Sequence, residues 1–433
     1  MPLAFLERAG FAPSTLDLAV ESLDEDRLRR ARLVAVSVPM HTALRLALRL
    51  LDRLRALNPG ARVVLHGLYA QLNRKLILER GAHAVLAGEM DESLARLAEQ
   101  LEAGREEPLP GVSRPGRPAD PALARLDFPV PDHRALPPLA AYAKLDLGHE
   151  QRLAAYTEAS RGCRHVCRHC PITPVYRGRF FVVPAEVVLE DVERQITRGA
   201  RHVTFGDPDF WNGPGHAEAI TRELHRRHPG ITYDATIKVE HLLRHRDRLA
   251  GLVETGCAFV TTAVESLSDL VLERLRKGHA AADVEAAFDA CEVAGLPLRP
   301  TFVAFTPWTT PADLGDLLAF VRRRDLAEVV DSVQYTLRLL IPPGSALLDL
   351  DIPGLGPLLE ETLSHGWRHP DARMDHLQRE LRSLAETAGS DRTATFERIC
   401  RAAEARLGLA PTAPPRRRRR QSHVPSLTES WFC

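Results

Sequence analysis

Three cysteines lie close together on one short segment of this chain. Cys163, Cys167 and Cys170 follow a C-x3-C-x2-C spacing within Ser-Arg-Gly-Cys-Arg-His-Val-Cys-Arg-His-Cys-Pro, residues 160–171. Three thiolates on one loop can bind a single metal centre, and they supply one ligand fewer than the four thiolates of an ordinary iron–sulfur electron carrier. A four-iron cluster held here would therefore keep one iron open to another molecule.

Two other interpretations of this segment remain open. A zinc site could use the three cysteines with His165 or His169 as the fourth ligand, or the thiols could bind no metal. Zinc sites usually contain paired C-x2-C units, and only one such pair occurs here. The spacing therefore favours the iron–sulfur interpretation.

Length, charge and hydropathy exclude several classes of protein. The 433 residues, of which 45% are hydrophobic, predict a globular protein of two or three domains. Lys plus Arg equals Asp plus Glu at 57 each, so the net charge gives no general attraction to nucleic acid or to an anionic membrane. No apolar run approaches the ~18 residues of a membrane span, and charges at Glu7 and Arg8 interrupt the only place where a signal peptide could begin. We expect a cytoplasmic protein in a reducing compartment.

Strand and helix patterns alternate over residues 1–103, which predicts a parallel, doubly wound α/β sheet. The expected strands cover residues 16–20, 32–38, 62–66 and 82–87, and the expected helices cover 3–9, 42–57, 71–80 and 91–101. Residues 104–150 are rich in proline and charge and are expected to form an extended linker between two domains.

A second alternation begins at residue 151 and predicts a partial (β/α)6 barrel of the TIM type up to residue 345. The expected strands are residues 154–159, 202–206, 231–236, 257–263, 299–305 and 332–337, with helices beginning at 184 and near 215–227, 241–250, 268–294 and 311–324. A helical extension should follow over 346–410, and a flexible tail over 411–433. The tail includes the five-arginine run Arg416–Arg420, which is more typical of a linker than of a nucleic-acid site.

The cysteine spacing directly after the first barrel strand resembles the radical S-adenosylmethionine superfamily. The resemblance implies a [4Fe-4S] cluster bound by Cys163, Cys167 and Cys170, whose open iron chelates the amino and carboxylate groups of S-adenosylmethionine. It also implies an external electron donor of the flavodoxin or ferredoxin type and a small-molecule substrate. The lack of a long apolar run argues against a membrane partner, and the balanced charge does not favour nucleic acid.

The same resemblance implies cofactor contacts at the ends of later strands. Gly206 with Asp207 or Asp209 follows the second strand, where the superfamily has a bend that meets the cofactor's amino group; a turn that caps the next helix is the alternative. Glu265 and Ser266 follow the fourth strand and resemble the acidic ribose contact, with an ordinary helix cap as the alternative. Lys238 with Glu240 could address the carboxylate or sulfonium, or form a solvated pair.

Two departures from the superfamily pattern concern adenine. His169 stands before the third cysteine, where the family often has an aromatic residue. The fifth strand, through Thr-Phe-Val-Ala-Phe-Thr-Pro-Trp at 301–308, lacks a glycine-rich adenine motif. The adenine side of the pocket is therefore the least defined by the sequence.

The N-terminal region is similar to the flavodoxin-like, cobalamin-binding domain that precedes many radical enzymes. The similarity lies in residues 36–42, 66–70 and 87–91, at the carboxyl ends of the expected strands, where ligands of such sheets bind. The Asp-x-His-x-x-Gly element that ligates cobalt in classical corrinoid proteins is absent. The resemblance admits cobalamin as a cofactor, and a structural or vestigial domain is the favoured interpretation.

Both ends of the chain suggest further coding sequence. The chain opens on the helix that should follow the central first strand of a flavodoxin-like sheet, which predicts an upstream β-branched strand. The last residues, Leu-Thr-Glu-Ser-Trp-Phe-Cys at 427–433, resemble a bacterial subfamily of radical proteins that end in Cys-selenocysteine (or Cys-Cys)-Ala-Glu-Pro. We therefore expect a UGA codon after Cys433 that encodes selenocysteine.

The tail resemblance also suggests a substrate. An enzyme similar to that subfamily transfers the aminocarboxypropyl part of S-adenosylmethionine to trivalent arsenic, a soft electrophile that thiolates bind well. Two rival hypotheses are a cobalamin-dependent radical methyltransferase and a non-catalytic metal-binding or nucleic-acid-binding protein that uses the arginine run.

Overall fold

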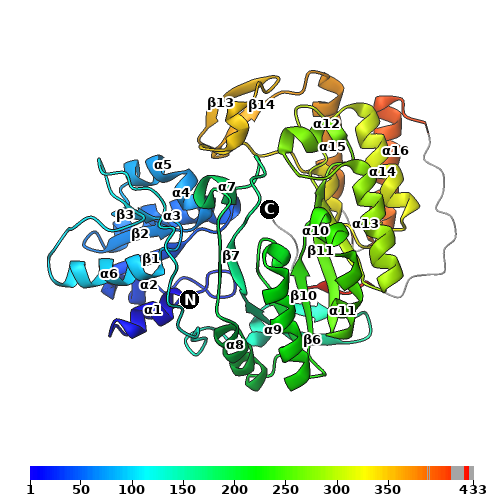
Figure 1. Cartoon of the computed structure of the whole chain (residues 1–433). Coiled ribbons are helices and arrows are strands. Elements are labelled where there is room, and N and C mark those ends of the chain that lie inside the picture. The colour runs from blue at the N-terminus through cyan, green and yellow to red at the C-terminus, as the bar shows by residue number, and fades with distance from the viewer. Residues whose placement is uncertain (388, 390, 411–423, 429–433) are drawn as a thin grey trace.

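The computed structural model describes residues 1–387, 389, 391–410 and 424–428. The described residues form an N-terminal α/β layer structure and a larger open barrel of parallel strands, with a pair of long helices beside the barrel (Figure 1). The expected α/β class with a half-barrel is confirmed. None of the described helices is long and apolar enough to cross a membrane.

The N-terminal sheet has the order β1-β2-β3-β4 among the described residues. The first three strands are parallel, and β4 runs antiparallel to β3. The elements in chain order are α1 (Pro2–Arg8), α2 (Glu25–Arg30), β1 (Leu33–Ser37), α3 (His41–Leu57), β2 (Arg62–His66), α4 (Leu68–Leu72), α5 (Arg74–Glu79), β3 (Ala84–Leu86), α6 (Asp91–Glu102) and β4 (Val112–Ser113).

Helices cover both faces of this sheet because successive side chains of a strand point to opposite faces. Val63 and Leu65 of β2 pack in one apolar cluster with the buried face of α3. Val64 between them packs in a second cluster with Leu94 and Leu97 of α6. The continuous apolar run of β2 is thus explained by burial on both sides, as the doubly wound prediction required.

One expected strand of this region is wrong. Residues 17–20 form a turn, in which the Val20 and Glu21 N–H groups donate to the Asp17 carbonyl. β1 pairs directly with β2, so the sheet shows no gap between these strands. Asp17 accepts a hydrogen bond from the Tyr142 hydroxyl at 2.9 Å, and a polar contact of this kind favours the turn over a strand. The upstream strand stays a prediction.

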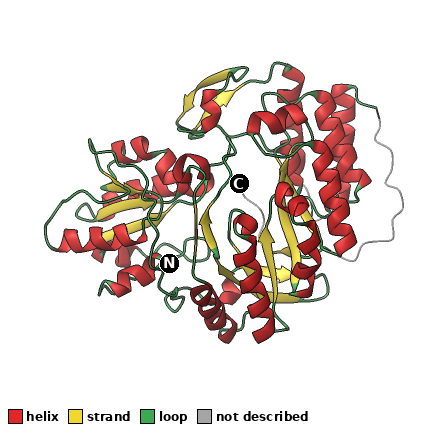
Figure 2. Cartoon of the chain, viewed as in Figure 1, coloured by secondary structure: helices red, strands yellow, loops and turns green. Residues whose placement is uncertain are grey.

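The larger sheet has the order β12-β11-β10-β9-β6-β5-β15. Figure 2 shows strands of the protein in yellow with helices in red beside them. Five strands from β6 to β12 are parallel, and β5 and β15 extend the β6 edge in antiparallel pairing. The strands are β5 (Lys144–Asp146), β6 (Gln151–Thr157), β9 (His202–Phe205), β10 (Thr232–Thr236), β11 (Cys257–Glu265), β12 (Leu298–Phe302) and β15 (Ser426–Leu427).

Helices follow each parallel strand and bury their apolar faces on the sheet. They share one core with the strands, in which Trp211, Tyr233 and Phe302 are fully buried. The helices and short turns are η1 (Leu139–Ala141), α8 (Ala185–Thr197), η2 (Phe210–Asn212), α9 (Pro214–Arg227), α10 (Val239–Arg244), η3 (Arg246–Arg248), α11 (Leu249–Glu254), α12 (Asp269–Leu275), α13 (Ala281–Ala294) and α14 (Pro311–Arg323).

Three expectations for the barrel are corrected by the structure. The helix expected over 268–294 is two helices, because Arg276 and Gly278 adopt positive φ of 57° and 79° between α12 and α13. The helix expected over 241–250 is likewise divided into α10, η3 and α11. The sixth strand is replaced by the 3-10 helix η4 (Ser332–Thr336), after which a single parallel bridge joins Phe305 to Arg338.

The extension contains a hairpin as well as the expected helices. The segment runs through η5 (Ala346–Asp349), β13 (Leu355–Leu359), β14 (Ser364–Trp367), α15 (Ala372–Glu386) and α16 (Arg392–Leu407). Residues 424–428 return to the barrel, where β15 pairs with β5. The arginine run and the last residues, Trp431, Phe432 and Cys433, lie outside the described residues.

Candidate functional site

The cysteine segment leaves the sheet at the carboxyl end of β6 and is enclosed by a small hairpin. β7 (Ser160–Gly162) pairs antiparallel with β8 (Phe180–Val182), and the Cys163 N–H donates to the Arg179 carbonyl at 3.1 Å. Gly162 has φ +76°, and a Cβ on it would lie 2.4 Å from the Tyr176 ring of α7 (Ile172–Tyr176). Only glycine fits at this junction, so Gly162 sets the path of the cysteine loop.

The three thiols of the loop form a donor set that suits a soft metal centre. Cys163 and Cys167 are buried, Cys170 is half-buried, and none of them forms a disulfide. Burial raises the pKa of the Cys163 thiol to about 11 and that of the Cys170 thiol to about 12. Without a cation these thiols stay protonated, whereas a bound metal centre displaces the protons and is held by thiolates.

The other described cysteines lie elsewhere in the barrel and extension. Cys257 begins β11, at the opposite end of the strand from the loop, and Cys291 and Cys400 lie inside α13 and α16. The loop therefore supplies three thiols among the described residues. Three thiols fit a [4Fe-4S] cluster with one open iron.

Two buried lysines face the thiols. The Lys238 ammonium, at the end of β10, lies 3.9 Å from the Cys167 sulfur and 3.7 Å from a Glu240 carboxylate oxygen. The Lys277 ammonium lies 3.3 Å from the Glu265 carboxylate. Burial alone would lower the pKa of Lys277, but the charges of Glu265 and Cys167 outweigh burial and raise it. Both cations can balance the negative charge of a thiolate-bound centre.

Glu265 is held in an unusual backbone conformation beside the loop. It ends β11 with φ +66°, next to a register irregularity between β11 and β12. Its carboxylate accepts a hydrogen bond from His169 at 3.2 Å as well as pairing with Lys277. Burial alone would raise the pKa of Glu265, but Lys277 and His169 lower it to about 2. Glu265 is therefore an ionised acceptor at the carboxyl edge of the barrel.

The residues expected at the bend after β9 make hydrogen bonds and close contacts with other residues of the protein. Asp207 accepts hydrogen bonds from the Ala159 N–H at 2.8 Å and the Ser160 hydroxyl at 2.6 Å. Burial raises the pKa of Asp207 to about 7, although these donors favour its charged form. Gly206 packs against the Tyr156 hydroxyl, where a Cβ would clash. This bend thus supports the start of the cysteine loop, and its role in cofactor binding stays a prediction.

Ser266 and Asp209 also have internal partners. The Ser266 hydroxyl accepts from the Ser268 N–H at 3.1 Å, just before α12, and its role in ribose binding stays a prediction. The Asp209 carboxylate lies 3.4 Å from His165 and 2.9 Å from His241. Burial alone would raise the pKa of Asp209, but the two imidazoles lower it well below its usual value.

Three site residues were missed by the sequence analysis. Lys277 and His279 lie between α12 and α13, in a segment that was assigned to one continuous helix. Gly278 was the available signal, because glycine commonly ends or interrupts a helix. Asn212 accepts a hydrogen bond from the Arg164 N–H at 3.1 Å and contacts the Cys163 sulfur, and no sequence signal distinguished it.

A different arrangement occupies the carboxyl edge of the N-terminal sheet, where the resemblance placed cobalamin. Asp91 and Glu89 are buried there and face Arg161 of β7, whose guanidinium lies 2.5 Å and 3.6 Å from their carboxylates. The Tyr176 hydroxyl donates to Glu89 at 2.8 Å, and His66 is buried nearby with its pKa lowered to about 4 by desolvation. These contacts join this edge of the sheet to the cysteine hairpin, and cobalamin binding at this edge stays a prediction.

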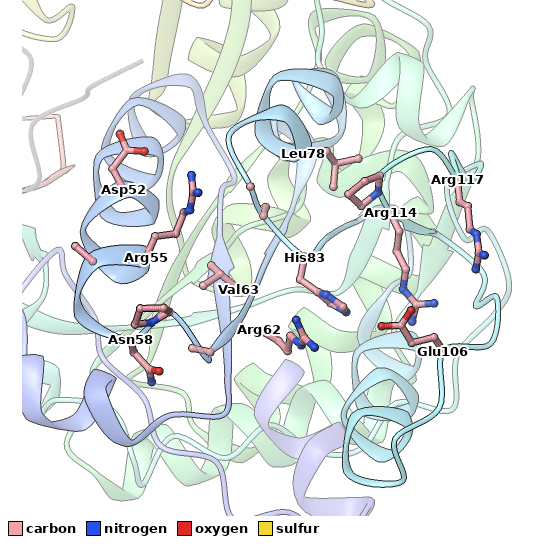
Figure 3. Close-up of a pocket in the computed structure, with 16 residues that line it drawn as sticks. Asp52, Arg55, Asn58, Arg62, Val63, Leu78, His83, Glu106, Arg114 and Arg117 are labelled. Carbon is pink, nitrogen blue, oxygen red and sulfur yellow. The ribbon is translucent and has the colours of Figure 1, made fainter.

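The described residues also line a large cavity at the opposite, amino edge of the same sheet (Figure 3). It has a volume of about 850 Å³. Its walls include four arginines with His83 and Glu106: Arg55, Arg62, Arg114 and Arg117. Ligands of doubly wound sheets bind at the carboxyl edge, so this cavity is not the candidate active site despite its size.

Comparison with known proteins matches the region around the cysteine loop. Residues 157–321 match the model of the Radical SAM superfamily. The ribosomal protein uS12 methylthiotransferase RimO of Opitutus terrae is 26% identical over 191 residues, which are 39% of this chain and 40% of that protein. The tRNA-2-methylthio-N(6)-dimethylallyladenosine synthase of Chlorobium phaeovibrioides is 27% identical over 153 residues, which are 32% of each protein. The chain thus spans about two fifths or less of the length of these relatives.

Solved structures resemble a larger part of the chain. The cobalamin-dependent radical enzyme OxsB superposes with a TM-score of 0.65 at 14% identity, over 88% of this chain and 64% of that one. The radical S-adenosylmethionine methyltransferase TsrM from Kitasatospora setae has a TM-score of 0.65 at 16% identity, over 95% of this chain and 86% of that one. At these identities the likeness shows a shared fold.

The chain is an α/β protein with a half-barrel and a three-cysteine loop at the carboxyl edge of that barrel. The family match supports placing the chain in the radical SAM superfamily and indicates that it is an enzyme. Enzymes of this superfamily use a [4Fe-4S] cluster and S-adenosylmethionine. The more specific assignment to the Cys-selenocysteine-Ala-Glu-Pro subfamily stays a prediction.

Proposed function

We propose that the protein cleaves S-adenosylmethionine reductively at a [4Fe-4S] cluster held by Cys163, Cys167 and Cys170, and uses the product fragment to modify a small molecule. The observation that carries the proposal is the enclosed loop of three thiols, two buried and one half-buried and none in a disulfide, at the carboxyl edge of the matched barrel. The cluster, when bound, supplies an electron to the cofactor's sulfonium and an open iron for its amino and carboxylate groups.

The protein residues around the loop supply charge balance and orientation. Lys238 and Lys277 place two buried ammonium groups beside the thiols, which favours a centre that carries negative charge. Glu265 remains ionised, so its carboxylate is available to accept hydrogen bonds from the ribose hydroxyls. We propose that Gly206 and Asp207 shape the adjacent bend and that the Lys238 ammonium binds the carboxylate of the cofactor.

A polar cavity inside the barrel supports a small-molecule substrate. It has a volume of about 160 Å³ and is lined from four parallel strands, with Gly206 and Asp207 at one side. Asp234 and Arg299 give its wall charges of both signs, and Leu427 of the returning C-terminal segment also lines it. A substrate bound here would lie beside the residues that follow β9, and thus near the cysteine loop.

For the substrate itself we propose transfer of an aminocarboxypropyl group to trivalent arsenic. The support is the terminal sequence at 427–433, whose cysteine provides a soft donor for a soft electrophile. Cleavage of the bond between sulfur and the aminocarboxypropyl carbon releases methylthioadenosine, whereas cleavage of the ribosyl carbon–sulfur bond releases methionine. The nucleoside product therefore distinguishes this proposal from adenosyl chemistry.

The electron is proposed to come from an external donor of the flavodoxin or ferredoxin type. The exposed Arg177, which follows α7 on the cysteine loop, supports a docking surface for an acidic donor. Its guanidinium pairs only with the exposed Asp120, at 2.9 Å, among the described residues. An exposed pair of this kind contributes little to stability and is easily exchanged for another acidic partner.

The test is the metal content of protein reconstituted without oxygen. We expect about four iron and four sulfide per chain, from the cluster stoichiometry, with equal content in a Cys291→Ala control. A chain that binds zinc without sulfide at these cysteines would refute the proposal and favour the zinc-site alternative.

A further inference from the structure

Three side chains from three separate elements meet beside the cysteine loop. His165 belongs to the loop, Asp209 follows β9, and His241 lies on α10. One ligand atom from each lies within 4.8 Å of those of the other two. Asp209 and His241 are almost completely buried, and His165 is mostly buried. The set is therefore enclosed by protein and is built from distant parts of the sequence.

The three side chains lie close together, but some of their polar atoms have no hydrogen-bond partner. The Asp209 Oδ2 and His241 Nδ1 atoms lie 2.9 Å apart, yet both are buried without a hydrogen-bond partner of acceptable geometry. The His165 Nε2 atom lies 3.4 Å from the same Asp209 oxygen and 3.3 Å from the His241 Nε2 atom. Ligand atoms around one metal ion are about 2.9–3.4 Å apart when each bond is about 2.0–2.2 Å long. The Asp209 Oδ2 atom lies at such distances from His241 Nδ1 and His165 Nε2, whereas the 3.3 Å contact involves the other nitrogen of His241, which would not bind the same ion.

The surroundings orient these side chains as metal ligands are usually oriented. The second ring nitrogen of His165 faces the Glu240 carboxylate at 3.6 Å. The second oxygen of Asp209 accepts from the Trp211 N–H at 3.3 Å and the Lys238 N–H at 3.4 Å. A ligating histidine commonly directs its other nitrogen to a carboxylate, and a ligating carboxylate is commonly fixed by backbone donors.

We propose that His165, Asp209 and His241 form a binding site for a divalent first-row transition-metal ion, separate from the cluster cysteines. Two imidazoles and one carboxylate are a donor set that binds zinc, iron or cobalt and leaves positions for water. An ion here joins the cysteine loop, the bend after β9 and α10. It therefore fixes the loop against the barrel through His165, which stands between Cys163 and Cys167.

Zinc binding to the full-length, cluster-loaded protein tests this site. Protein reconstituted without oxygen is incubated with zinc sulfate, desalted and analysed for zinc by mass spectrometry. We expect about one zinc per chain from the single triad. His241→Gln and Asp209→Asn should each lower the retained zinc at least tenfold, because each removes one of three ligands. His245→Gln is the matched control, since His245 caps the same helix outside the triad.

A second arm separates this site from the cysteines. The variant Cys163→Ala/Cys167→Ala/Cys170→Ala should retain its zinc, and with cobalt it should show visible d–d bands without a thiolate charge-transfer band. Circular dichroism and thermal unfolding establish that each variant is folded. The proposal is overturned if folded His241→Gln and Asp209→Asn retain as much zinc as the wild type, if the wild type retains none, or if the cysteine variant loses it.

Discussion

The carboxyl edges of the two sheets differ in how their buried charges are arranged. At the barrel edge, the Lys238 ammonium faces the Cys167 thiol, and none of the three loop thiols forms a disulfide. At the N-terminal edge, Asp91 and Glu89 are bound by Arg161 and Tyr176 from the cysteine hairpin. The first arrangement suits an added cofactor, and the second joins two regions of the chain.

The buried charges at the N-terminal edge form a contact between two regions of the chain. Asp91 and Glu89 occupy the position from which doubly wound sheets bind cofactors, but their charges serve the junction with β7. Arg161 also pairs with Glu158 at 3.0 Å, just before the cysteine loop. The N-terminal region therefore supports the loop from one side, while the barrel supplies the chemistry.

The largest effect should come from the barrel edge. Replacing Cys167 with alanine leaves the cluster two protein ligands, and we expect loss of the cluster absorption and of cofactor cleavage to below about one hundredth of the wild-type rate. Cys291→Ala should retain both, because Cys291 is buried inside α13. Full cleavage by Cys167→Ala would refute the cluster assignment.

Arg161→Met breaks the junction at the other edge. It leaves the buried carboxylates of Asp91 and Glu89 without their cation. Breaking a buried charge pair costs about 3–5 kcal/mol, which we expect to lose from the free energy of unfolding in urea denaturation. Arg226→Met is the control, because its pair with Glu223 is exposed. An unchanged midpoint for Arg161→Met would show that the network does not stabilise the junction.

Lys277→Met tests the charge arrangement of the barrel edge. The substitution leaves the buried Glu265 carboxylate with His169 as its remaining partner. We expect a loss of about 1.5–3 kcal/mol in stability, the range for a hydrogen bond to a charged group. Lys75→Met, at an exposed lysine with a weak pair to Glu79, should cost less than about 0.5 kcal/mol. Equal losses in the two variants would contradict the assigned role of Lys277.

The pH dependence of stability tests whether His66, at the N-terminal edge, is buried in its neutral form. Desolvation lowers the pKa of His66 from 6.5 to about 4, so the unfolded chain binds a proton more readily than the folded chain between these values. Stability is therefore lost as the pH falls through this window, by about 2 kcal/mol from pH 7 to pH 5. His66→Gln should remove the His66 share of the loss in urea denaturation, whereas His279, whose pKa burial also lowers to about 4, continues to contribute a similar loss. The same slope in wild type and variant would contradict the buried, neutral state of His66.

The sequence predicted the parts of the fold that depend on local periodicity. The apolar positions of α3 and the β-branched run of β2 gave the correct elements, because burial on two faces leaves a regular pattern. The strands expected at residues 16–20 and 332–337 were wrong because the local sequence pattern does not decide the structure of these segments. Long-range contacts decide these short segments: the Gln334 side chain, for example, accepts from the Phe302 N–H at 2.8 Å and replaces strand pairing there.

The candidate site was predictable where residues are neighbours in sequence and not where they meet only in space. The spacing of the cysteines identified the loop, since all three ligands lie within eight residues. His241 comes from α10 and Lys277 from the segment between α12 and α13, and no local pattern connects them to the loop. The pairing of Asp209 with two histidines depends on the folded barrel and could be found only from the structure.

The most direct test of the central claim is a single-turnover measurement with the reductant dithionite. Reconstituted protein is mixed with S-adenosylmethionine, and the nucleoside released per cluster is measured. We expect up to one nucleoside per cluster in the wild type and in Cys291→Ala, and none above background in Cys167→Ala. Equal product from Cys167→Ala, or no product from a wild type with its full iron and sulfide, would contradict it.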